Sequence, residues 1–232
     1  MHAVILQARL DSSRLPGKTM LPLGGKPLIF RVMEALNKIP ANLRILACPE
    51  DSAVTFTPLA CEAGFELFTG PKDDVLARYC LTIERFGVKH VIRATGDNPF
   101  VFIDSAAAIN TEALALGADY SGYSGLPLGA GVEYISATAL LRAAKKATPF
   151  EREHVCPYLY AHPENFLLHR PLAPLHWQAP EIRLTVDTQD DYEQAQVLYA
   201  ALDRQENTGI ISGEERYHGA NIISAYRGVM CV

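Results

Sequence analysis

Four cationic side chains are concentrated in one segment near the start of the chain, residues 7–27, which is rich in glycine and proline. The segment follows an apolar run, residues 3–6, that predicts a buried first strand. A flexible cationic loop at the carboxyl end of a first α/β strand is a common position for anionic ligands. We therefore predict that this segment binds phosphates. Its cations are Arg9, Arg14, Lys18 and Lys26.

The same segment is close to a Walker A box but departs from it in two ways. A Walker A loop needs a glycine, four residues, Gly-Lys-Ser/Thr and then a helix whose amides cradle the phosphates. Gly17-Lys18-Thr19 fits, but Ser12 stands at the position of the first glycine. The prolines and the glycine pair within residues 22–27 oppose a helix, because proline lacks the amide and glycine carries an entropic cost. We expect an extended loop and a helix that begins near Leu28.

Two aspartates follow predicted strands later in the chain. Asp97 lies in a turn after the run 88–93, and Asp187 closes the run 182–186. Two carboxylates opposite a cluster of cations are what a magnesium-dependent phosphoryl site requires, because Mg²⁺ takes oxygen ligands and bridges phosphates. The alternative is that each aspartate caps the next helix, and Asp190 is an equally good cap for the late helix.

Length and composition limit the class of protein. With 232 residues that are 49% hydrophobic, we expect one α/β domain over residues 1–232. The net charge of -5 disfavours nucleic acid as a partner, and no Gly-x-Gly-x-x-Gly follows the first strand, which disfavours a dinucleotide cofactor. No apolar run approaches about 18 residues, so we expect no membrane partner and a cytoplasmic location.

The five cysteines are widely spread and contain no Cys-x-x-Cys pair. This spacing disfavours a disulfide framework or a structural zinc site and is typical of a reducing cytoplasm. They are Cys48, Cys61, Cys80, Cys156 and Cys231.

Strand-like and helix-like runs alternate through the first half of the chain. Such alternation predicts a mostly parallel sheet with helices on both faces. Asp73 or Asp74 can cap the first of the helices. The expected strands are 43–48, 65–68, 88–93 and 118–120, and the expected helices are 73–86 and 104–116.

The second half is less regular. Residues 121–136 predict a loop or an antiparallel excursion, which continues into a proline-rich segment, 163–180. We expect this excursion, about 121–180, to supply an acceptor site or a dimer surface. Other expected elements are helices at 137–147 and 151–161, a strand at 182–186 and a helix that ends near Arg204.

Six motifs, in order along the chain, resemble one enzyme family. They stand at residues 7–18, 23–28, 73–79, 93–99, 151–158 and 183–187. The first, Gln-Ala-Arg-x-x-Ser-Ser-Arg-Leu-Pro-Gly-Lys, is similar to the signature of the cytidylyltransferases that activate acidic sugars. These include the CMP-sialic acid and CMP-Kdo synthetases. The whole set most resembles the branch called spore coat polysaccharide biosynthesis protein F. The resemblance implies a three-layer α/β/α, nucleotide-diphospho-sugar transferase-like fold and a possible homodimer.

The resemblance also implies roles for single residues. Arg9, Arg14 and Lys18 contact the nucleotide phosphates, while Asp97 and Asp187 bind Mg²⁺. Arg14, Lys18 and Asp97 are the implied catalytic residues. On the acceptor side, the nearest candidates are Glu133, Glu153 and His154.

Other side chains have two interpretations. Ser12 and Ser13 have no nearby base, so we interpret them as nucleotide contacts and not as nucleophiles. Arg78 serves the nucleotide or the sugar, or belongs to a solvated helix face. Three tyrosines line a sugar pocket or pack in the core or an interface. They are Tyr120, Tyr123 and Tyr134.

The implied reaction couples a nucleoside triphosphate, with CTP expected, to an acidic sugar or sugar phosphate. It releases pyrophosphate, requires Mg²⁺ and serves polysaccharide or glycan biosynthesis. Two alternatives stay open: a non-catalytic nucleotide- or sugar-binding component, and a glycosyltransferase that uses a nucleotide-sugar. Glycosyltransferases of this broad fold typically carry Asp-x-Asp, whereas this chain has Asp97-Asn-Pro99, which favours nucleotidyl transfer.

Overall fold

The apolar run near the N-terminus forms an inner strand of the sheet. In the computed structural model, which describes residues 1–230, β1 (His2–Gln7) lies between β4 (Leu43–Pro49) and β6 (His90–Thr95) and is parallel to both. β5 (Glu66–Gly70) continues the parallel sheet beyond β4. These pairings confirm the predicted parallel arrangement and place the carboxyl ends of β1 and β6 side by side.

The excursion extends this sheet on the other side. Beyond β6 lie β8 (Glu133–Ser136), β7 (Tyr120–Ser121) and β9 (Leu168–His169), which completes a seven-stranded sheet in the order β5-β4-β1-β6-β8-β7-β9. β8 runs antiparallel to both of its neighbours, while β7 and β9 are parallel. The mostly parallel sheet is therefore interrupted by one reversed strand.

Helices cover both faces of the sheet, because alternate residues of β1 enter opposite cores. Ala3 and Ile5 pack against one layer, and Val4 and Leu6 pack against the other. The first layer contains α3 (Val75–Phe86), α5 (Ala137–Ala144) and α7 (Pro157–Ala161). The second contains α1 (Leu28–Leu36), α2 (Glu50–Ala63), α4 (Ile103–Leu116), α8 (Gln189–Asn207) and α9 (Gly219–Met230).

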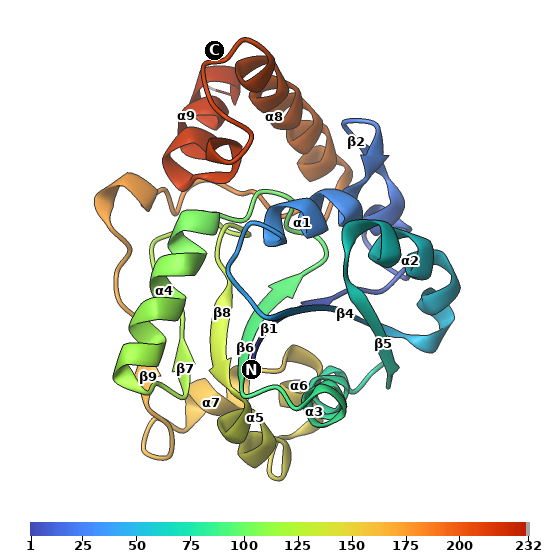
Figure 1. Cartoon of the computed structure of the whole chain (residues 1–232), viewed down its shortest axis with the longest axis vertical. Coiled ribbons are helices and arrows are strands. Elements are labelled where there is room, and N and C mark those ends of the chain that lie inside the picture. The colour runs from blue at the N-terminus through green and yellow to red at the C-terminus, as the bar shows by residue number, and fades with distance from the viewer. Residues whose placement is uncertain (231–232) are drawn as a thin grey trace.

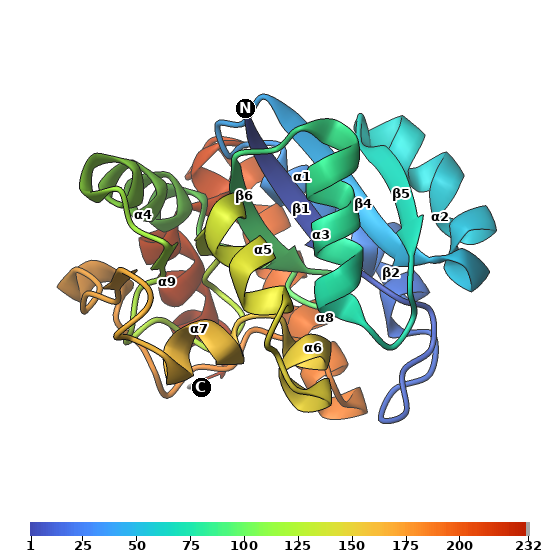
Figure 2. The same cartoon turned by 90° about the horizontal axis from the view of Figure 1, so that it is seen from below.

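The figures show this layering from two sides. In Figure 1, α8 and α9 lie above the sheet, and α3 and α5 lie below it. Figure 2, seen from below, shows α3 and α5 in front of the strands. The three-layer α/β/α fold is confirmed.

The cationic segment after β1 is extended, as predicted. A single 3₁₀ turn, Lys18–Met20, is followed by a hairpin of β2 (Pro22–Leu23) and β3 (Lys26–Pro27). The two glycines between these strands have φ angles of 54° and 79°, which favour glycine. α1 then begins at Leu28. The segment is therefore not a Walker P-loop.

The predicted helix 151–161 is wrong as one element. The structure contains two short helices, α6 (Pro149–His154) and α7, separated by Val155 with a φ of 74°. Pro157 has no amide to donate to the preceding turn, so a continuous helix would be interrupted there. A positive φ on a β-branched residue stores about 1–3 kcal/mol of strain. The helix predicted at 137–147 also ends earlier, at Ala144.

The predicted strand 182–186 is also wrong. This segment makes one isolated bridge, between Arg183 and Leu128, and is not a strand of the sheet. The backbone amide of Val186 donates to Asp97 O at 2.9 Å instead. The apolar residues Ile182, Leu184 and Val186 are buried, but the segment does not pair as a strand along its length. That bond nevertheless brings the residues before Asp187 beside the turn after β6.

Two further observations concern the remaining expectations. None of the helices formed by residues 1–230 has the length and apolar character needed to cross a membrane. The cysteines at 48, 61, 80 and 156 are free thiols, and Cys231 lies outside the described residues.

Candidate active site

A cavity of about 280 Å³ opens where β1 and β6 end and the cationic loop begins. Ten of the residues to which the family resemblance and the loop assign a role line it, whereas Glu133 and Lys26 do not. Segments far apart in the sequence thus meet at one place, as expected for the carboxyl edge of a parallel sheet. The predicted residues in its wall are Arg9, Ser12, Ser13, Arg14, Lys18, Arg78, Asp97, Glu153, His154 and Asp187.

Lys18 connects the two predicted metal ligands. Its Nζ atom lies 2.8 Å from Oδ2 of Asp97 and 2.8 Å from Oδ1 of Asp187. The lysine side chain is 12% exposed, so this contact is largely shielded from water. The carboxylates therefore converge on one point although they belong to different parts of the chain.

The alternative interpretation of these aspartates as helix caps is wrong. Thr188 caps α8, because its hydroxyl accepts from the amide of Asp191 at 3.2 Å. α4 begins after Phe102 without a side-chain cap. Asp97 and Asp187 are thus free to face the cavity.

A second layer of contacts fixes the orientation of Asp187. Arg183 donates from Nη2 to Oδ2 of Asp187 at 2.7 Å and from Nε to Oδ1 of Asp191 at 2.8 Å. Oδ2 of Asp191 accepts from the amides of Asp187 and Thr188, each at 2.9 Å. On the open side, Arg14 Nη2 lies 2.9 Å from Oδ1 of Asp187. The Oδ2 atom is therefore held by the protein, and Oδ1 faces the loop cations.

The surrounding cations keep these carboxylates ionised. Burial acts to raise the pKa of Asp187, but the hydrogen bond and charge of Lys18, with Arg14 and Arg183, outweigh it and hold that pKa below its usual value. Burial acts in the same direction on Asp191, but Arg183 and the backbone amides lower its pKa to about 2.

The donor chemistry of the two aspartates fits a magnesium ion. Carboxylate oxygens are the donors that Mg²⁺ prefers, and Asp97 and Asp187 direct theirs to one point. Within residues 1–230 there is no group of three or more His, Cys, Asp or Glu side chains that could hold a metal ion. Two carboxylates leave most of an octahedral shell to phosphate oxygens and water, which is the usual arrangement for Mg²⁺ at nucleotide sites.

Arg78 is a buried cation in the wall of the cavity. It is 2% exposed, and its Nη1 donates to the carbonyl of Pro71 at 2.6 Å. None of its hydrogen bonds within the described chain goes to a carboxylate. Burial is the main cause that lowers its pKa. The interpretation of Arg78 as part of a solvated helix face is therefore wrong; among the described residues it is a buried cation beside the cavity with no hydrogen bond to a carboxylate.

Lys26 and Arg9, the other two cations of the loop, pair with acidic residues other than Asp97 and Asp187. Lys26 is not in the cavity wall; its Nζ lies 2.6 Å from Glu62 Oε1 and 4.7 Å from the ring centre of Phe30. Arg9 lines the cavity with its Nε 3.6 Å from Oδ1 of Asp11. Arg9, Arg14 and Lys18 are thus the cations that the loop contributes to the cavity.

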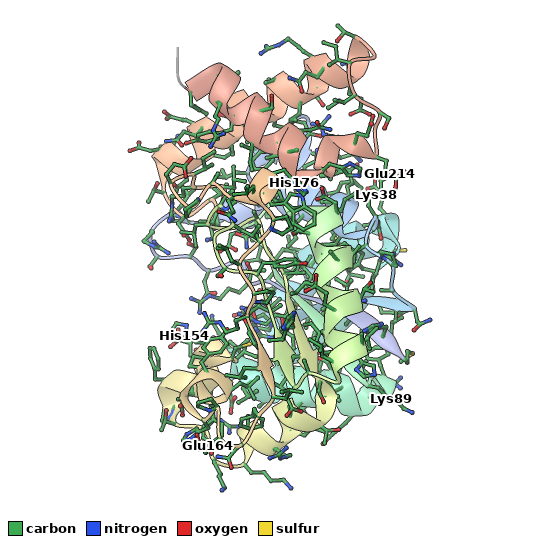
Figure 3. All side chains as sticks on the ribbon, turned by 90° about the vertical axis from the view of Figure 1, so that its left-hand side faces the viewer. Lys38, Lys89, His154, Glu164, His176 and Glu214 are labelled. Carbon is green, nitrogen blue, oxygen red and sulfur yellow. The ribbon has the colours of Figure 1, made fainter. Side chains whose placement is uncertain are left out.

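Glu153 and His154 reach the cavity from α6. In Figure 3, His154 is on the left of the view, below His176 and Glu214 and above Glu164. α6 contains no buried residue, and Arg152 anchors it through Nε to Oδ2 of Asp74 at 2.7 Å. Asp74 also caps α3, since it accepts from the amide of Ala77 at 2.8 Å. An ion pair therefore connects the wall formed by α6 to the start of α3.

Glu133 lies in a second pocket of about 250 Å³, which shares Thr95 with the first. The carboxylate pairs with Arg93 and accepts from the hydroxyls of Tyr120 and Tyr160. Burial acts to raise the pKa of Glu133, but Arg93 and both hydroxyls outweigh it and keep that pKa below its usual value. The pocket thus has a charged, hydrogen-bonded wall next to the phosphate cavity.

The tyrosines divide between the two interpretations. Tyr120 and Tyr123 line this second pocket. Tyr134 does not; it is 2% exposed and its hydroxyl lies 2.6 Å from Nδ1 of His90. Tyr134 is therefore a packing residue.

The sequence also held signals for site residues that we did not predict. Arg93 is a charge inside an otherwise apolar strand, which often indicates a buried ion pair. Arg183 stands four residues before Asp187 and bonds to it. Asp191 looked like one of several helix-start acids, and only the structure shows that it fixes Arg183.

Comparisons with known proteins give a consistent assignment. A family model described as cytidylyltransferase matches residues 3–216. The spore coat polysaccharide biosynthesis protein SpsF of Bacillus subtilis is 33% identical over 203 residues, which cover 84% of this chain and 85% of that protein. The resemblance seen in the motifs is confirmed.

Two solved structures share the fold. A cytidylyltransferase from Leptospira borgpetersenii superposes with a TM-score of 0.86 at 21% identity, covering 98% of this chain and 94% of that one. A CMP:2-keto-3-deoxy-manno-octonic acid synthetase complexed with CTP gives a TM-score of 0.67 at 15% identity, covering 86% and 98%. Together with the family match over most of its length, this establishes that the chain belongs to the cytidylyltransferase family and is a nucleotidyltransferase.

Proposed function

We propose that this protein transfers a CMP group from CTP to a sugar hydroxyl and releases pyrophosphate, in a polysaccharide or glycan pathway. The observation that carries the proposal is the convergence of Asp97 and Asp187 on Lys18, inside a cavity lined by the loop cations. The SpsF relative supports the pathway, and the structural neighbour in complex with CTP supports the choice of nucleotide.

The side chains of the cavity divide the work. Arg9, Arg14 and Lys18 neutralise the triphosphate, while Arg78 adds a buried charge at the α3 side. Asp97 and Asp187 would hold Mg²⁺, which supplies Lewis-acid stabilisation of charge on the phosphates. The backbone of the loop, with Ser12 and Ser13, lies where it can donate to phosphate oxygens.

The acceptor is proposed to occupy the pocket that contains Glu133, since this pocket adjoins the phosphate cavity at Thr95. A hydroxyl held there would attack the α-phosphorus; a new O–P bond forms as the bond to the pyrophosphate oxygen breaks, and the hydroxyl proton leaves to solvent. Nucleotidyl transfer of this kind depends mainly on positioning and electrostatics. In this arrangement Glu153 and His154 line the cavity proposed for the nucleotide and not the pocket proposed for the acceptor.

The identity of the acceptor as an acidic sugar or sugar phosphate, a homodimer formed through the excursion and a cytoplasmic location are parts of the same proposal. They rest on family membership.

The test is pyrophosphate release from each of the four nucleoside triphosphates with a panel of acidic sugars and sugar phosphates. We expect release with CTP and one acceptor class, and a loss of about 10³-fold or more for Asp97→Asn with an unchanged unfolding midpoint. Asp190→Asn is the matched control, because Asp190 is an exposed acid at the start of α8 and lines neither pocket. Undiminished release by Asp97→Asn would remove Asp97 from the mechanism.

The same assay separates the two alternatives. A binding component would bind CTP in calorimetry and give no product with any acceptor. A glycosyltransferase would consume a nucleotide-sugar and release free nucleotide.

A further inference from the structure

Lys18 occupies the position between the two carboxylates that a metal ion would take. Its ammonium contacts both at 2.8 Å, and its side chain is more shielded than those of Arg14 and Asp97, which are 63% and 27% exposed. We propose that Lys18 is a built-in counterion that excludes free divalent metal from the nucleotide-free site, so that metal enters only together with the nucleotide. This inference rests on the proposed role of Asp97 and Asp187 as metal ligands.

The charges of the cluster are already balanced. The cations Lys18, Arg14 and Arg183 face the carboxylates of Asp97, Asp187 and Asp191. A divalent ion alone would add two positive charges to this neutral group, among three fixed cations. It would also have to displace both side chains that share Oδ1 of Asp187. Binding of free metal is therefore opposed twice, by repulsion and by competition for the same oxygen.

A polyphosphate reverses this balance. It brings several negative charges into the cavity and offers new hydrogen-bond acceptors to Lys18 and Arg14. Lys18 can follow, because an ammonium on a four-carbon stem is a mobile point charge with three donors. Oδ1 of Asp187 and Oδ2 of Asp97 are then released for a metal that the phosphates carry with them.

Arg183 stays behind in this exchange. Its Nη2 holds the other oxygen of Asp187, and Asp191 fixes its Nε. The carboxylate of Asp187 therefore keeps its orientation while its inner partner leaves. Arg183 is thus the fixed cation that orients the carboxylate of Asp187, and Lys18 is the mobile cation that blocks its metal-binding oxygen.

The experiment is a titration of nucleotide-free protein with Mn²⁺, in which the electron paramagnetic resonance signal of free Mn²⁺ reports binding. We expect weak binding by the wild type and at least tenfold tighter binding by Lys18→Met, which keeps the side-chain length and removes the charge. Lys18→Gln provides a second neutral variant should the first fail to fold. Lys26→Met is the matched control, since Lys26 belongs to the same segment but pairs with Glu62 outside the cavity.

A double variant locates the effect. Adding Asp97→Asn to Lys18→Met should return Mn²⁺ affinity to the wild-type level, because the tighter site uses that carboxylate. The inference is overturned by wild-type protein that binds free Mn²⁺ as tightly as the Lys18 variants, or by a gain that survives in the double variant. The readout needs no turnover, so a wild type that transfers no CMP but shows the expected metal pattern would reject the proposed function alone.

Discussion

Gly24 lies against the phenol ring of Tyr199, so closely that no side chain fits between them. A Cβ atom on Gly24 would be 2.0 Å from Cε1 of Tyr199. The hydroxyl of Tyr192 also donates to the carbonyl of Pro22 at 2.6 Å. The hairpin that follows the phosphate loop thus packs on α8, the helix that begins two residues after Asp187. The two sides of the site are therefore in contact through this hairpin and this helix.

This contact predicts different costs for two neighbouring glycines. Gly24→Ala should lower the free energy of unfolding by about 2–4 kcal/mol, because it combines overpacking against Tyr199 with a positive φ. Gly25→Ala should cost only about 1 kcal/mol, since its φ is 79° but nothing lies within 4 Å of a new Cβ. Urea denaturation of the two variants measures the difference. Equal losses of unfolding free energy in the two variants would show that the hairpin shifts away from Tyr199 at little cost.

The ion pair between Arg152 and Asp74 predicts a role for α6 in nucleotide binding. Arg152→Ala should raise KM for the nucleotide about three- to tenfold, roughly 1 kcal/mol, and reduce hydrogen-exchange protection in residues 149–154. The reason is that α6 buries no residue and ends at the strained Val155. Lys146→Ala, an exposed cation before α6, is the control. Unchanged KM together with lost protection would mean that α6 does not contribute to the nucleotide site.

Asp191 predicts a loss of stability in acid. The pKa of Asp191 is about 2 in the folded protein, below the ordinary value of 3.8 that it has in the unfolded chain. The contribution of this carboxylate to the free energy of unfolding is therefore complete above pH 3.8 and disappears as the pH falls toward 2. Wild type should therefore exceed Asp191→Asn in unfolding free energy at pH 5, and this advantage should shrink steadily below pH 3.8. Urea unfolding at a series of pH values measures it. Asp190→Asn, which removes an exposed acid from the same helix turn, is the control. An advantage of the wild type over Asp191→Asn that stays constant with pH would contradict the assignment.

The largely shielded pair of Arg93 and Glu133, whose side chains are 15% and 20% exposed, predicts asymmetric costs. Glu133→Ala should destabilise the fold by about 3 kcal/mol, because Arg93 would be left largely shielded from water without its counter-charge. Replacing both residues, as Arg93→Met with Glu133→Leu, should recover much of the loss. Glu112→Ala, which removes a half-exposed carboxylate beside His169, should cost about 1 kcal/mol or less. A double variant no more stable than Glu133→Ala would show that the charge itself is not the cause.

Local patterns predicted the parts of the site that depend on a strand and the turn after it. The apolar run before Gln7 and the run before Asp97 both form parallel strands, and their carboxyl ends meet where expected. Pro22 and the paired glycines likewise determined that no helix follows Lys18, because backbone chemistry acts within a few residues.

Features that depend on distant partners could not be predicted in this way. Residues 182–186 alternate like a strand, but alternation reports burial of one side and not hydrogen bonding, and their partners lie at Leu128 and Asp97. The reversed direction of β8, which pairs Arg93 with Glu133, depends on a register that no local pattern shows. The sequence analysis did not predict α2 or α9. α2 contains Pro58, which locally disfavours a helix, whereas α9 is stabilised by packing against distant residues.

The contact between Lys18 and Asp187 joins residues 169 positions apart, and that between Lys18 and Asp97 joins residues 79 apart. Contacts of such long range form late in folding, because the entropy of closing the chain must be overcome first. On the ribosome, a chain that has emerged only as far as β6 already carries its cationic loop but lacks both carboxylates, because β6 ends at Thr95. A nascent or truncated chain that stops before Asp187 would therefore be unable to bring these three side chains together.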